Sequence, residues 1–256
     1  MRLLARSVIL FFTSILIFGS SAEAGEAEVA FVIYDVKADR TTVSNPNLAD
    51  QGYLPCSTFK IPNTLIGLTT GVIPDEKFAL KWDGKHYEIA EWNHDHDLAS
   101  ALKNSVVWFY QEVARRIGAE RMKKYVDLFQ YGNRDTCCAI DQFWLHGKLR
   151  ITPKQEVDFL RRMDAGQLPV KPQHVALVRR LITLESTPAY TLQGKTGSGT
   201  QDGRSLGWLV GFVEKPTGKW IYALLTVAAY GQTAPSREQR VVMVKKLLVE
   251  RGVLPR

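Results

Sequence analysis

The chain has 256 residues, with 33 Lys and Arg against 26 Asp and Glu, and a formal net charge of +7. Its basic residues are spread through helical stretches such as "ARRIGAERMKKY" and "MVKKLLVER", which is typical of solvated helix faces and argues against nucleic-acid binding. A mild attraction for anionic small molecules is compatible with this charge. The length suits one large domain or two smaller ones.

The first 24 residues have the pattern of a secretory signal peptide. Arg2 and Arg6 give a positive start, the apolar run "SVILFFTSILIF" follows, and small residues at 22–24 offer a cleavage site. The apolar run is short for a membrane span. We therefore expect a leader over residues 1–24 and a mature protein that is soluble in the periplasm, with no membrane attachment after cleavage.

The three cysteines are Cys56, Cys137 and Cys138, an odd number. One disulfide is possible in an oxidising compartment, and the sequence does not select its partners. Their spacing does not match a zinc motif, so we expect no metal site.

The first part of the chain predicts one strand followed by helices. "EVAFVIYDV" is β-branched and apolar, as in a strand. Residues 58–70 are predicted as a helix that ends before Gly71, and residues 99–129 carry two helical patterns separated by Gly118. Two further helices are predicted in "TPKQEVDFLRRMDAGQLP", which begins with Thr-Pro, and in "KPQHVALVRRLITLE".

The last part returns to strands. "LGWLVGFVE" and "KWIYALLTVAA" are strand-like and joined by the hairpin signal "KPTG", and "PSREQRVVMVKKLLVERG" predicts a closing helix. We therefore expect an α/β (α+β) fold, with an antiparallel sheet that is flanked by helices, is built from both termini and holds an inserted all-helical region. In the expected domain, 25–256, the sheet subdomain covers about 25–60 and 185–256, and the helical subdomain about 61–184.

The stretch "CSTFK", residues 56–60, places Ser57 and Lys60 three residues apart, on one face of a helix. A nucleophilic Ser needs a neighbouring base, and Lys serves as one only if burial keeps it neutral. The alternative is a Ser helix cap followed by a surface Lys. Considered alone, the S-x-x-K motif favours this alternative. Pro62 lacks a backbone donor, so we expect the first turn to be tight or irregular.

Three further motifs have both a chemical and an ordinary interpretation. Ser105 in "NSVVW" is either a proton relay or a helix cap. "YGN", residues 131–133, is either a loop whose side chains face a cleft or plain loop chemistry. "GKTGSG", residues 194–199, is either a strand edge that docks a carboxylate, with Gly197 allowing close approach, or a turn with a solvated Lys.

Taken in order over about 140 residues, S-x-x-K, S-x-V, Y-G-N and K-T-G form the signature of penicillin-recognising serine enzymes. The chain resembles class D β-lactamases, the oxacillinase type, through nearly all of its mature length. The resemblance rests on "STFKIPNTLIGLTTGVI", "FALKWDGK", "YGN", "IDQFWLHGKLRIT" and "GKTG" followed by "GWLVGFVE". Y-G-N with F-W-L downstream is typical of class D, whereas class A uses S-D-N and a separate Glu.

The resemblance implies a serine β-lactamase that confers antibiotic resistance. Ser57 would attack the lactam carbonyl and form an acyl-enzyme, and Lys60, as N6-carboxylysine, would be the general base. Trp144 would donate its indole N–H to the carbamate, and Ser105 would pass a proton to the lactam nitrogen. No cofactor is implied beyond the carbon dioxide or bicarbonate that carboxylates Lys60. Phe59, Val107 and Leu145 would supply the apolar shell.

The resemblance also implies how a small-molecule β-lactam is held. Lys195 and Thr196 would bind the substrate carboxylate with an Arg of the last helix, either Arg237 or, as the alternative, Arg240. The backbone N–H groups of Ser57 and Ser198 would form the oxyanion hole. Val107, Tyr131, Leu145 and Gly197 complete the expected substrate-binding set. "DTCCA" departs from the family pattern and leaves the loop shape open, and the protein is expected to be a monomer or a homodimer.

Other functions leave weaker signals. "HDHDL" resembles the start of an H-x-H-x-D-H zinc site, but Leu98 stands where Asp is needed, so an exposed polar loop is the better interpretation. A sensor domain that acylates without turnover shares S-x-x-K and K-T-G but is tethered to a membrane transducer. A cell-wall DD-peptidase is a third possibility. The spectrum of β-lactams, carbapenems included, is left open.

Overall fold

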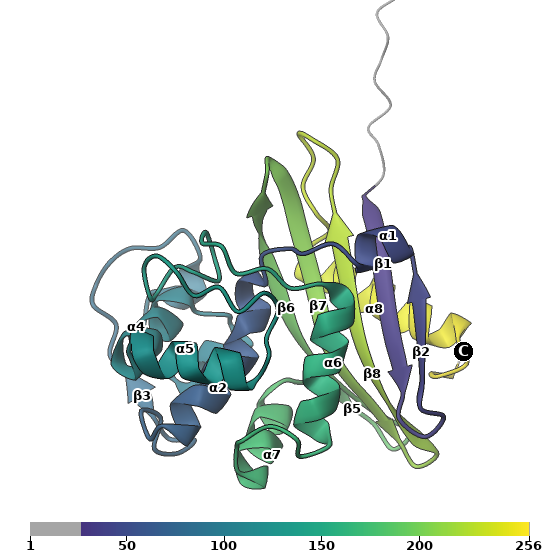
Figure 1. Cartoon of the computed structure of the whole chain (residues 1–256), viewed down its shortest axis with the longest axis horizontal. Helices are drawn as coiled ribbons and strands as arrows, with labels where there is room; N and C mark the ends of the chain where they lie inside the picture. Colours follow the sequence, from purple (N-terminus) through teal and green to yellow (C-terminus); the bar gives the residue numbers. More distant parts are fainter. Residues whose placement is uncertain (1–26, 256) are drawn as a thin grey trace, which may run out of the picture.

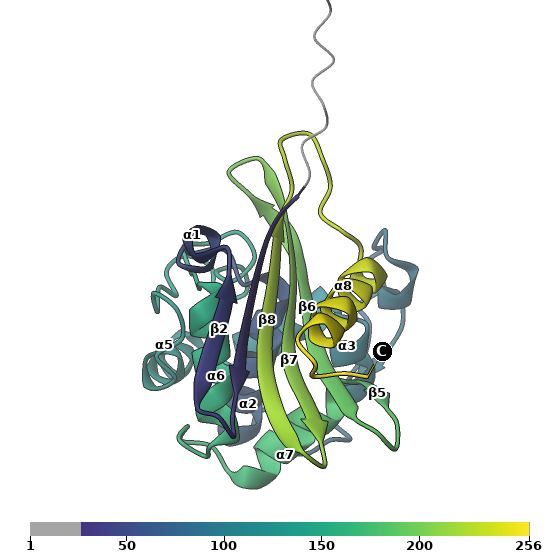
Figure 2. The ribbon, with the colours of Figure 1, turned by 90° about the vertical axis from the view of Figure 1, so that its right-hand side faces the viewer.

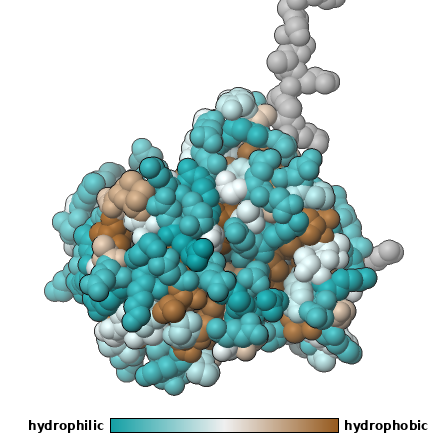
Figure 3. Space-filling view, viewed as in Figure 1, coloured by the Kyte–Doolittle hydropathy of each residue, from teal (hydrophilic) through white to brown (hydrophobic). Residues whose placement is uncertain are grey.

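The computed structural model describes residues 27–255, which form a sheet with helices on both of its faces (Figures 1 and 2). The expected leader, residues 1–24, lies outside the described residues, and its removal stays a prediction. Within 27–255, no helix combines the length and the apolar character that a membrane crossing requires. Polar side chains cover most of the face seen in Figure 3, with small apolar areas between them.

Six antiparallel strands form the sheet, in the order β2-β1-β8-β7-β6-β5. β1 pairs with β8 along its whole length, so both ends of the chain build one sheet, as predicted. The hairpin expected at "KPTG" joins β7 to β8, with Lys215 opposite Gly218. The strands are β1 (Glu28–Asp35), β2 (Arg40–Ser44), β5 (Thr183–Ser186), β6 (Thr191–Gln201), β7 (Arg204–Lys215) and β8 (Gly218–Val227).

Side chains alternate along the central strands between two hydrophobic cores. On β7, Trp208, Val210 and Phe212 enter the large core beneath most of the helices. Leu209 and Val213 on the same strand enter a smaller core. The smaller core is covered by α8 (Arg237–Glu250), which Figure 2 shows alone on its face of the sheet.

The remaining elements lie on the other face, most of them in the part at the left of Figure 1. Two of the predicted helix starts are confirmed, because Thr152 and Ser236 each form a capping box at the head of a helix. The elements are α1 (Pro46–Ala49), η1 (Cys56–Phe59), α2 (Lys60–Thr69), β3 (Ala79–Leu80), η2 (Ala90–Trp92), β4 (His96–Asp97), α3 (Leu98–Lys103), α4 (Val107–Ile117), α5 (Ala119–Leu128), α6 (Pro153–Asp164) and α7 (Pro172–Leu181).

Three features differ from the predicted fold. The region 61–184 is not all-helical, because β3 and β4 pair within it. The first helical pattern of 99–129 is two helices, α3 and α4, because the chain turns between them with Ser105 at φ 58°, in the left-handed region. The helix predicted in "KPQHVALVRRLITLE" ends at Leu181, and the next residues form β5 on the edge of β6.

α6 packs against β8 and β1 rather than only among the helices. It therefore bridges the sheet and the helical region, as Figure 1 shows, where it runs in front of the strands. This position matters for the site, because α6 lies behind the turn that carries Ser57.

Candidate active site

The "CSTFK" stretch forms a 3₁₀ turn, η1, that runs directly into α2. Pro62 has no N–H to give to the carbonyl of Thr58, and the tight first turn expected from that is present. The Lys60 N–H instead reaches the carbonyl oxygens of Ser57 and Thr58. The turn is buried, and Ser57 is 8% exposed at its surface. The sequence thus sets a nearly enclosed hydroxyl at the head of a helix.

Lys60 donates a hydrogen bond of 2.7 Å from Nζ to the Ser57 Oγ atom, so the two residues meet as their spacing predicted. The Lys60 side chain is fully buried, and its Nζ atom lies 5.4 Å from the centre of the Tyr110 ring. Burial lowers the pKa of Lys60 to about 7. A neutral amine is therefore available near neutral pH, which the alternative of a surface Lys does not provide.

Aromatic side chains surround this pair. Phe59 stacks on Trp144 with 5.5 Å between ring centres and meets Phe143 edge-on at 5.0 Å. The Nε1 atom of Trp144 is buried and has no hydrogen-bond partner among the described residues. A buried donor without an acceptor is costly. The position of this indole N–H therefore suits an additional acceptor group attached to the Lys60 amine. Val107 and Leu145, expected in the apolar shell, are half-buried.

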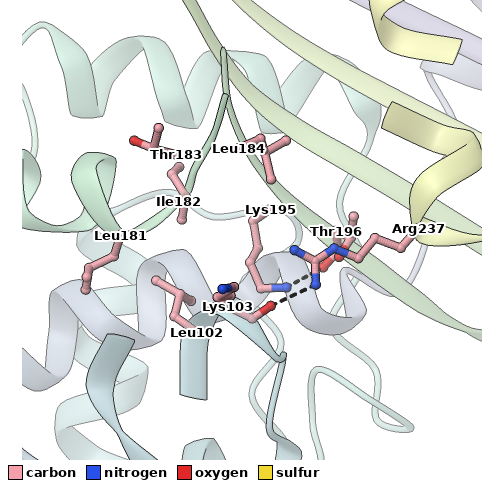
Figure 4. A pocket seen from close by; sticks show the side chains of 10 residues that line it. Leu102, Lys103, Leu181, Ile182, Thr183, Leu184, Lys195, Thr196 and Arg237 are labelled. Atoms are coloured by element: carbon pink, nitrogen blue, oxygen red, sulfur yellow. Dashed lines mark hydrogen bonds between the residues drawn. The ribbon is translucent and has the colours of Figure 1, made fainter. Parts of the chain in front are cut away.

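Lys195 connects the sheet to the helical region. Its Nζ atom donates to Ser105 Oγ at 2.8 Å and to the Thr196 carbonyl at 2.9 Å. Burial, with Lys60 and the nearby arginines, lowers the pKa of Lys195 well below its usual value. Lys195, Thr196 and Arg237 line a small cavity of about 30 Å³ between β6 and the helices (Figure 4).

Glycines let β6 lie directly against η1. A Cβ atom on Gly197 would stand 2.9 Å from the Pro55 carbonyl and 3.3 Å from the Ser57 backbone nitrogen. A Cβ atom on Gly199 would stand 2.5 Å from Cys56 Sγ. The close approach expected at Gly197 is therefore to η1 of the same chain. β5 pairs with β6 only as far as Gln193, so beyond Gln193 no strand of the described region pairs with this edge of β6.

The two arginines left open by the sequence differ in position. Arg240 is buried and donates to the Gly197 carbonyl at 2.6 Å and to Ser198 Oγ at 2.9 Å. Its Nε atom is buried without a partner among residues 27–255. Arg237 is half-buried, donates to the Lys103 carbonyl at 3.0 Å and lines the cavity that holds Lys195 and Thr196. Arg240 thus bonds to the K-T-G strand itself, and Arg237 faces the cavity beside it.

Comparison with known proteins fits this geometry. The family described as penicillin binding protein transpeptidase domain matches residues 27–247. The probable β-lactamase YbxI of Bacillus subtilis (strain 168) is 40% identical over 200 residues, 78% of this chain and 74% of the relative. The β-lactamase OXA-48 of Klebsiella pneumoniae is 40% identical over 193 residues, 75% of this chain and 73% of that one. The crystal structure of the class D β-lactamase YbXI from Nostoc superposes with a TM-score of 0.83 at 36% identity, covering 89% of this chain and 95% of that one.

The chain belongs to the class D β-lactamase family. The resemblance seen in the sequence is therefore confirmed, together with its fold: a mixed α/β serine enzyme of the penicillin-recognising type.

The Y-G-N motif of this class D β-lactamase does not face a cleft. Tyr131 is fully buried, so the expected substrate contact is wrong for its side chain, and its hydroxyl donates to Glu156 Oε1 at 2.9 Å. Gly132 has φ 54°, and a Cβ atom there would stand 2.0 Å from the Arg150 carbonyl. Asn133 exchanges hydrogen bonds of 2.9 Å with the Arg150 backbone. The motif braces the segment that returns to the sheet after Trp144.

Three residues near the nucleophile were not found from the sequence: Thr58, Tyr110 and Glu156. Thr58 Oγ1 contacts Glu156 at 2.6 Å, and both are buried. A signal for Glu156 was present, because it shares the helical phase of Phe159, Leu160 and Met163, which enter the core. A carboxyl group at a core position of an amphipathic helix requires a buried partner.

The histidines of "HDHDL" and the three cysteines of the β-lactamase lie in surroundings that fit a structural role. His96 is buried, with Nδ1 3.0 Å from Ser100 Oγ and Nε2 2.8 Å from the Glu91 carbonyl. All three cysteines are free. Cys56 is buried, which raises the pKa of its thiol to about 12. Cys137 and Cys138 are exposed, with 3.1 Å between their sulfur atoms.

Proposed function

We propose that this class D β-lactamase opens the β-lactam ring through an acyl-enzyme on Ser57, with Lys60 in its N6-carboxylated form. The observation that carries the proposal is the 2.7 Å hydrogen bond between the Lys60 amine and the Ser57 hydroxyl inside a closed aromatic pocket. The pKa of Lys60, lowered to about 7 by burial, supports it, because only a neutral amine adds carbon dioxide.

The residues around Lys60 fit a carbamate. Trp144 has a buried indole N–H without an acceptor among the described residues, and a carbamate oxygen on Lys60 would accept it. In its carboxylated form the Lys60 side chain supplies a general base for the Ser57 hydroxyl and for the hydrolytic water. Phe59 and Trp144 exclude bulk water from this point, which favours the neutral amine over the ammonium ion.

The backbone around Ser57 supports the oxyanion hole that we propose from the N–H groups of Ser57 and Ser198. Gly197 permits β6 to approach η1 closely enough that a Cβ atom would lie 3.3 Å from the Ser57 nitrogen. Both donors belong to regular elements, so they are aligned before the substrate arrives. Removal of one such donor typically costs about 3 kcal/mol of transition-state stabilisation.

We assign substrate binding and proton delivery to the edge of β6 that β5 leaves unpaired. Ser105, which accepts a hydrogen bond from Lys195, keeps its own proton to donate to the lactam nitrogen. Lys195, Thr196 and Arg237 hold the substrate carboxylate. We choose Arg237 over Arg240 because Arg237 lines the cavity that holds Lys195 and Thr196, whereas Arg240 is buried and its guanidinium already bonds to Gly197 and Ser198.

The test is the reaction of the purified mature chain with a penicillin and with the chromogenic cephalosporin nitrocefin. Mass spectrometry of the quenched reaction is expected to find the penicillin adduct on the peptide that contains Ser57, and Ser57→Ala is expected to remain folded without adduct or turnover. Continuous turnover that bicarbonate accelerates supports the β-lactamase with a carboxylated Lys60. A single burst without turnover, even in bicarbonate, would indicate the β-lactam sensor instead.

A further inference from the structure

A buried carboxyl group lies behind the nucleophile turn, and the proposed reaction does not use it. Glu156 on α6 is 1% exposed. Its Oε1 atom lies 2.6 Å from Thr58 Oγ1 and 2.9 Å from the Tyr131 hydroxyl. In the part of the chain that the structure describes, it takes part in none of the ion pairs formed along α6. Glu156 therefore depends on two neutral hydroxyl groups.

The hydrogen atoms around Thr58 indicate which form of Glu156 is present. Thr58 has a single hydroxyl proton, yet its Oγ1 atom lies 2.8 Å from the Pro55 carbonyl as well as 2.6 Å from Glu156. An ionised carboxylate only accepts, so it would compete with Pro55 for that proton. A neutral Glu156 removes the competition, because its own O–H donates to Thr58 while Thr58 donates to Pro55.

We propose that Glu156 is a positioning residue that works in its protonated form, fixing the Ser57 turn through Thr58, and that its ionisation limits the enzyme at alkaline pH. Ionisation would draw the Thr58 proton away from Pro55, whose carbonyl lies at the contact between η1 and Gly197. Of the two bonds that Thr58 makes to the Pro55 carbonyl, the backbone bond from Thr58 N, at 3.1 Å, would then remain. The inference rests on the proposed function, since it concerns the residue that supports the nucleophile.

The electrostatic surroundings agree with this assignment. Burial raises the pKa of Glu156 to about 7. Tyr131 stays a donor, because burial raises its pKa well above the usual value, and the Cys56 thiol stays neutral with a pKa of about 12. The other charged groups around Glu156 bond elsewhere. On α6 the pairs are Lys154 with Asp50, Asp158 with Arg161 and Arg162, and Asp164 with Arg179 and Lys219. On the strands and nearby turns they are Glu28 with Arg204, Glu214 with Arg179 and Lys219, Asp35 with Trp220, Lys215 with the Val253 carbonyl, Arg150 with the Gly147 carbonyl and Lys60 with Ser57.

The test compares the wild type with Glu156→Gln across pH 5.5 to 9, in bicarbonate that keeps Lys60 carboxylated. Gln donates a hydrogen bond to Thr58 and does not ionise. We expect the wild-type kcat/KM for nitrocefin to fall above about pH 7, where Glu156 loses its proton. Glu156→Gln is expected to lie within about threefold of the wild type at pH 6, the cost of one weakened hydrogen bond, and to lack the alkaline fall. The exposed Glu120→Gln on α5 is the matched control and is expected to keep the wild-type profile.

A readout without turnover separates this inference from the proposed function. Carbon-13 NMR of the side-chain carboxyl groups in the wild type, assigned by the missing signal in Glu156→Gln, is expected to show Glu156 titrating near pH 7. A Glu156 carboxyl that titrates in its ordinary range near 4.3 would overturn the proposal whether or not β-lactams are hydrolysed. An alkaline fall unchanged in Glu156→Gln, or a folded Glu156→Gln that is inactive at every pH, would overturn it as well.

Discussion

Lys195 donates a hydrogen bond of 2.8 Å to the Ser105 hydroxyl, and this contact joins β6 of the sheet to the turn between α3 and α4. Ser105 occupies the left-handed region there, at φ 58°, where the chain turns from α3 into α4. A charged Lys195 amine has no lone pair with which to accept a hydrogen bond, so Lys195 is the donor in this contact. The Ser105 proton is then free for another acceptor.

Replacing Ser105 by Ala is expected to slow acylation. The lactam nitrogen would lose its proton donor, and general-acid groups typically contribute about 100-fold or more. Stopped-flow measurement of nitrocefin acylation checks this, with circular dichroism to verify the fold. The exposed Ser186→Ala on β5 is the control and is expected to acylate normally. Unchanged acylation in Ser105→Ala would remove Ser105 from the reaction.

Replacing Trp144 by Phe or Ala is expected to destabilise the Lys60 carbamate. The indole N–H is the one buried donor near Lys60 that lacks an acceptor in residues 27–255, and removing a donor to a buried anion costs about 1–3 kcal/mol. Acyl-enzyme is therefore expected to accumulate, and high bicarbonate is expected to restore much of the turnover. Carbon-13 NMR with labelled bicarbonate reports the carbamate directly. A wild type without this signal at neutral pH would contradict the carboxylated-lysine mechanism.

The two arginines of α8 are expected to differ in substrate binding. Arg237 lines the cavity that holds Lys195 and Thr196, so Arg237→Ala is expected to raise KM for penicillins more than it lowers kcat. Arg240→Ala, which removes buried hydrogen bonds to Gly197 and Ser198, serves as the matched variant and is expected to lower the free energy of unfolding rather than to raise KM selectively. Steady-state kinetics and urea titrations of both variants decide the assignment, which moves to Arg240 if only Arg240→Ala raises KM.

The thiols of the three cysteines are expected to differ in their reactivity toward a maleimide. Cys137 and Cys138 are exposed to a reagent in solution, whereas Cys56 is buried and lacks access to it. After reduction and desalting, a maleimide is expected to label two thiols in the native protein and a third only after unfolding, as counted by mass spectrometry. The double variant Cys137→Ser/Cys138→Ser is expected to take no label while folded. A disulfide that includes Cys56 would disagree with its buried position.

Burial of Lys60 is expected to couple folding to pH when carbon dioxide is excluded. Below about pH 7 the native state must bury an ammonium ion. As the pH rises further, the native state releases this proton, while the unfolded chain keeps it up to about 10.4. The free energy of unfolding, relative to Lys60→Met, is therefore expected to increase between pH 7 and 9 by about 2 kcal/mol. Urea titrations of both proteins test this, and parallel pH profiles would show that Lys60 titrates normally.

The features that the sequence determined are local. Ser57 and Lys60 meet because residues three apart share one side of a helical turn, whatever surrounds them. Thr152 and Ser236 begin their helices because each side chain bonds to the backbone three residues later. The β7–β8 hairpin follows from two apolar runs and the turn between them. These arrangements depend on hydrogen bonds and periodicities within a few residues, so they can be inferred before the fold is known.

The tertiary structure decided burial and pairing between distant segments. Only packing shows that Lys60 is enclosed by aromatic rings, that Trp144 has no acceptor within residues 27–255, and that Tyr131 turns inward to Glu156. The choice between Arg237 and Arg240 is of the same kind, since both lie within one turn of α8 and only the position of β6 separates them. The physical reason is desolvation: the pKa of a Lys or Glu side chain depends on which segments exclude water from it, and those segments lie far apart in the chain.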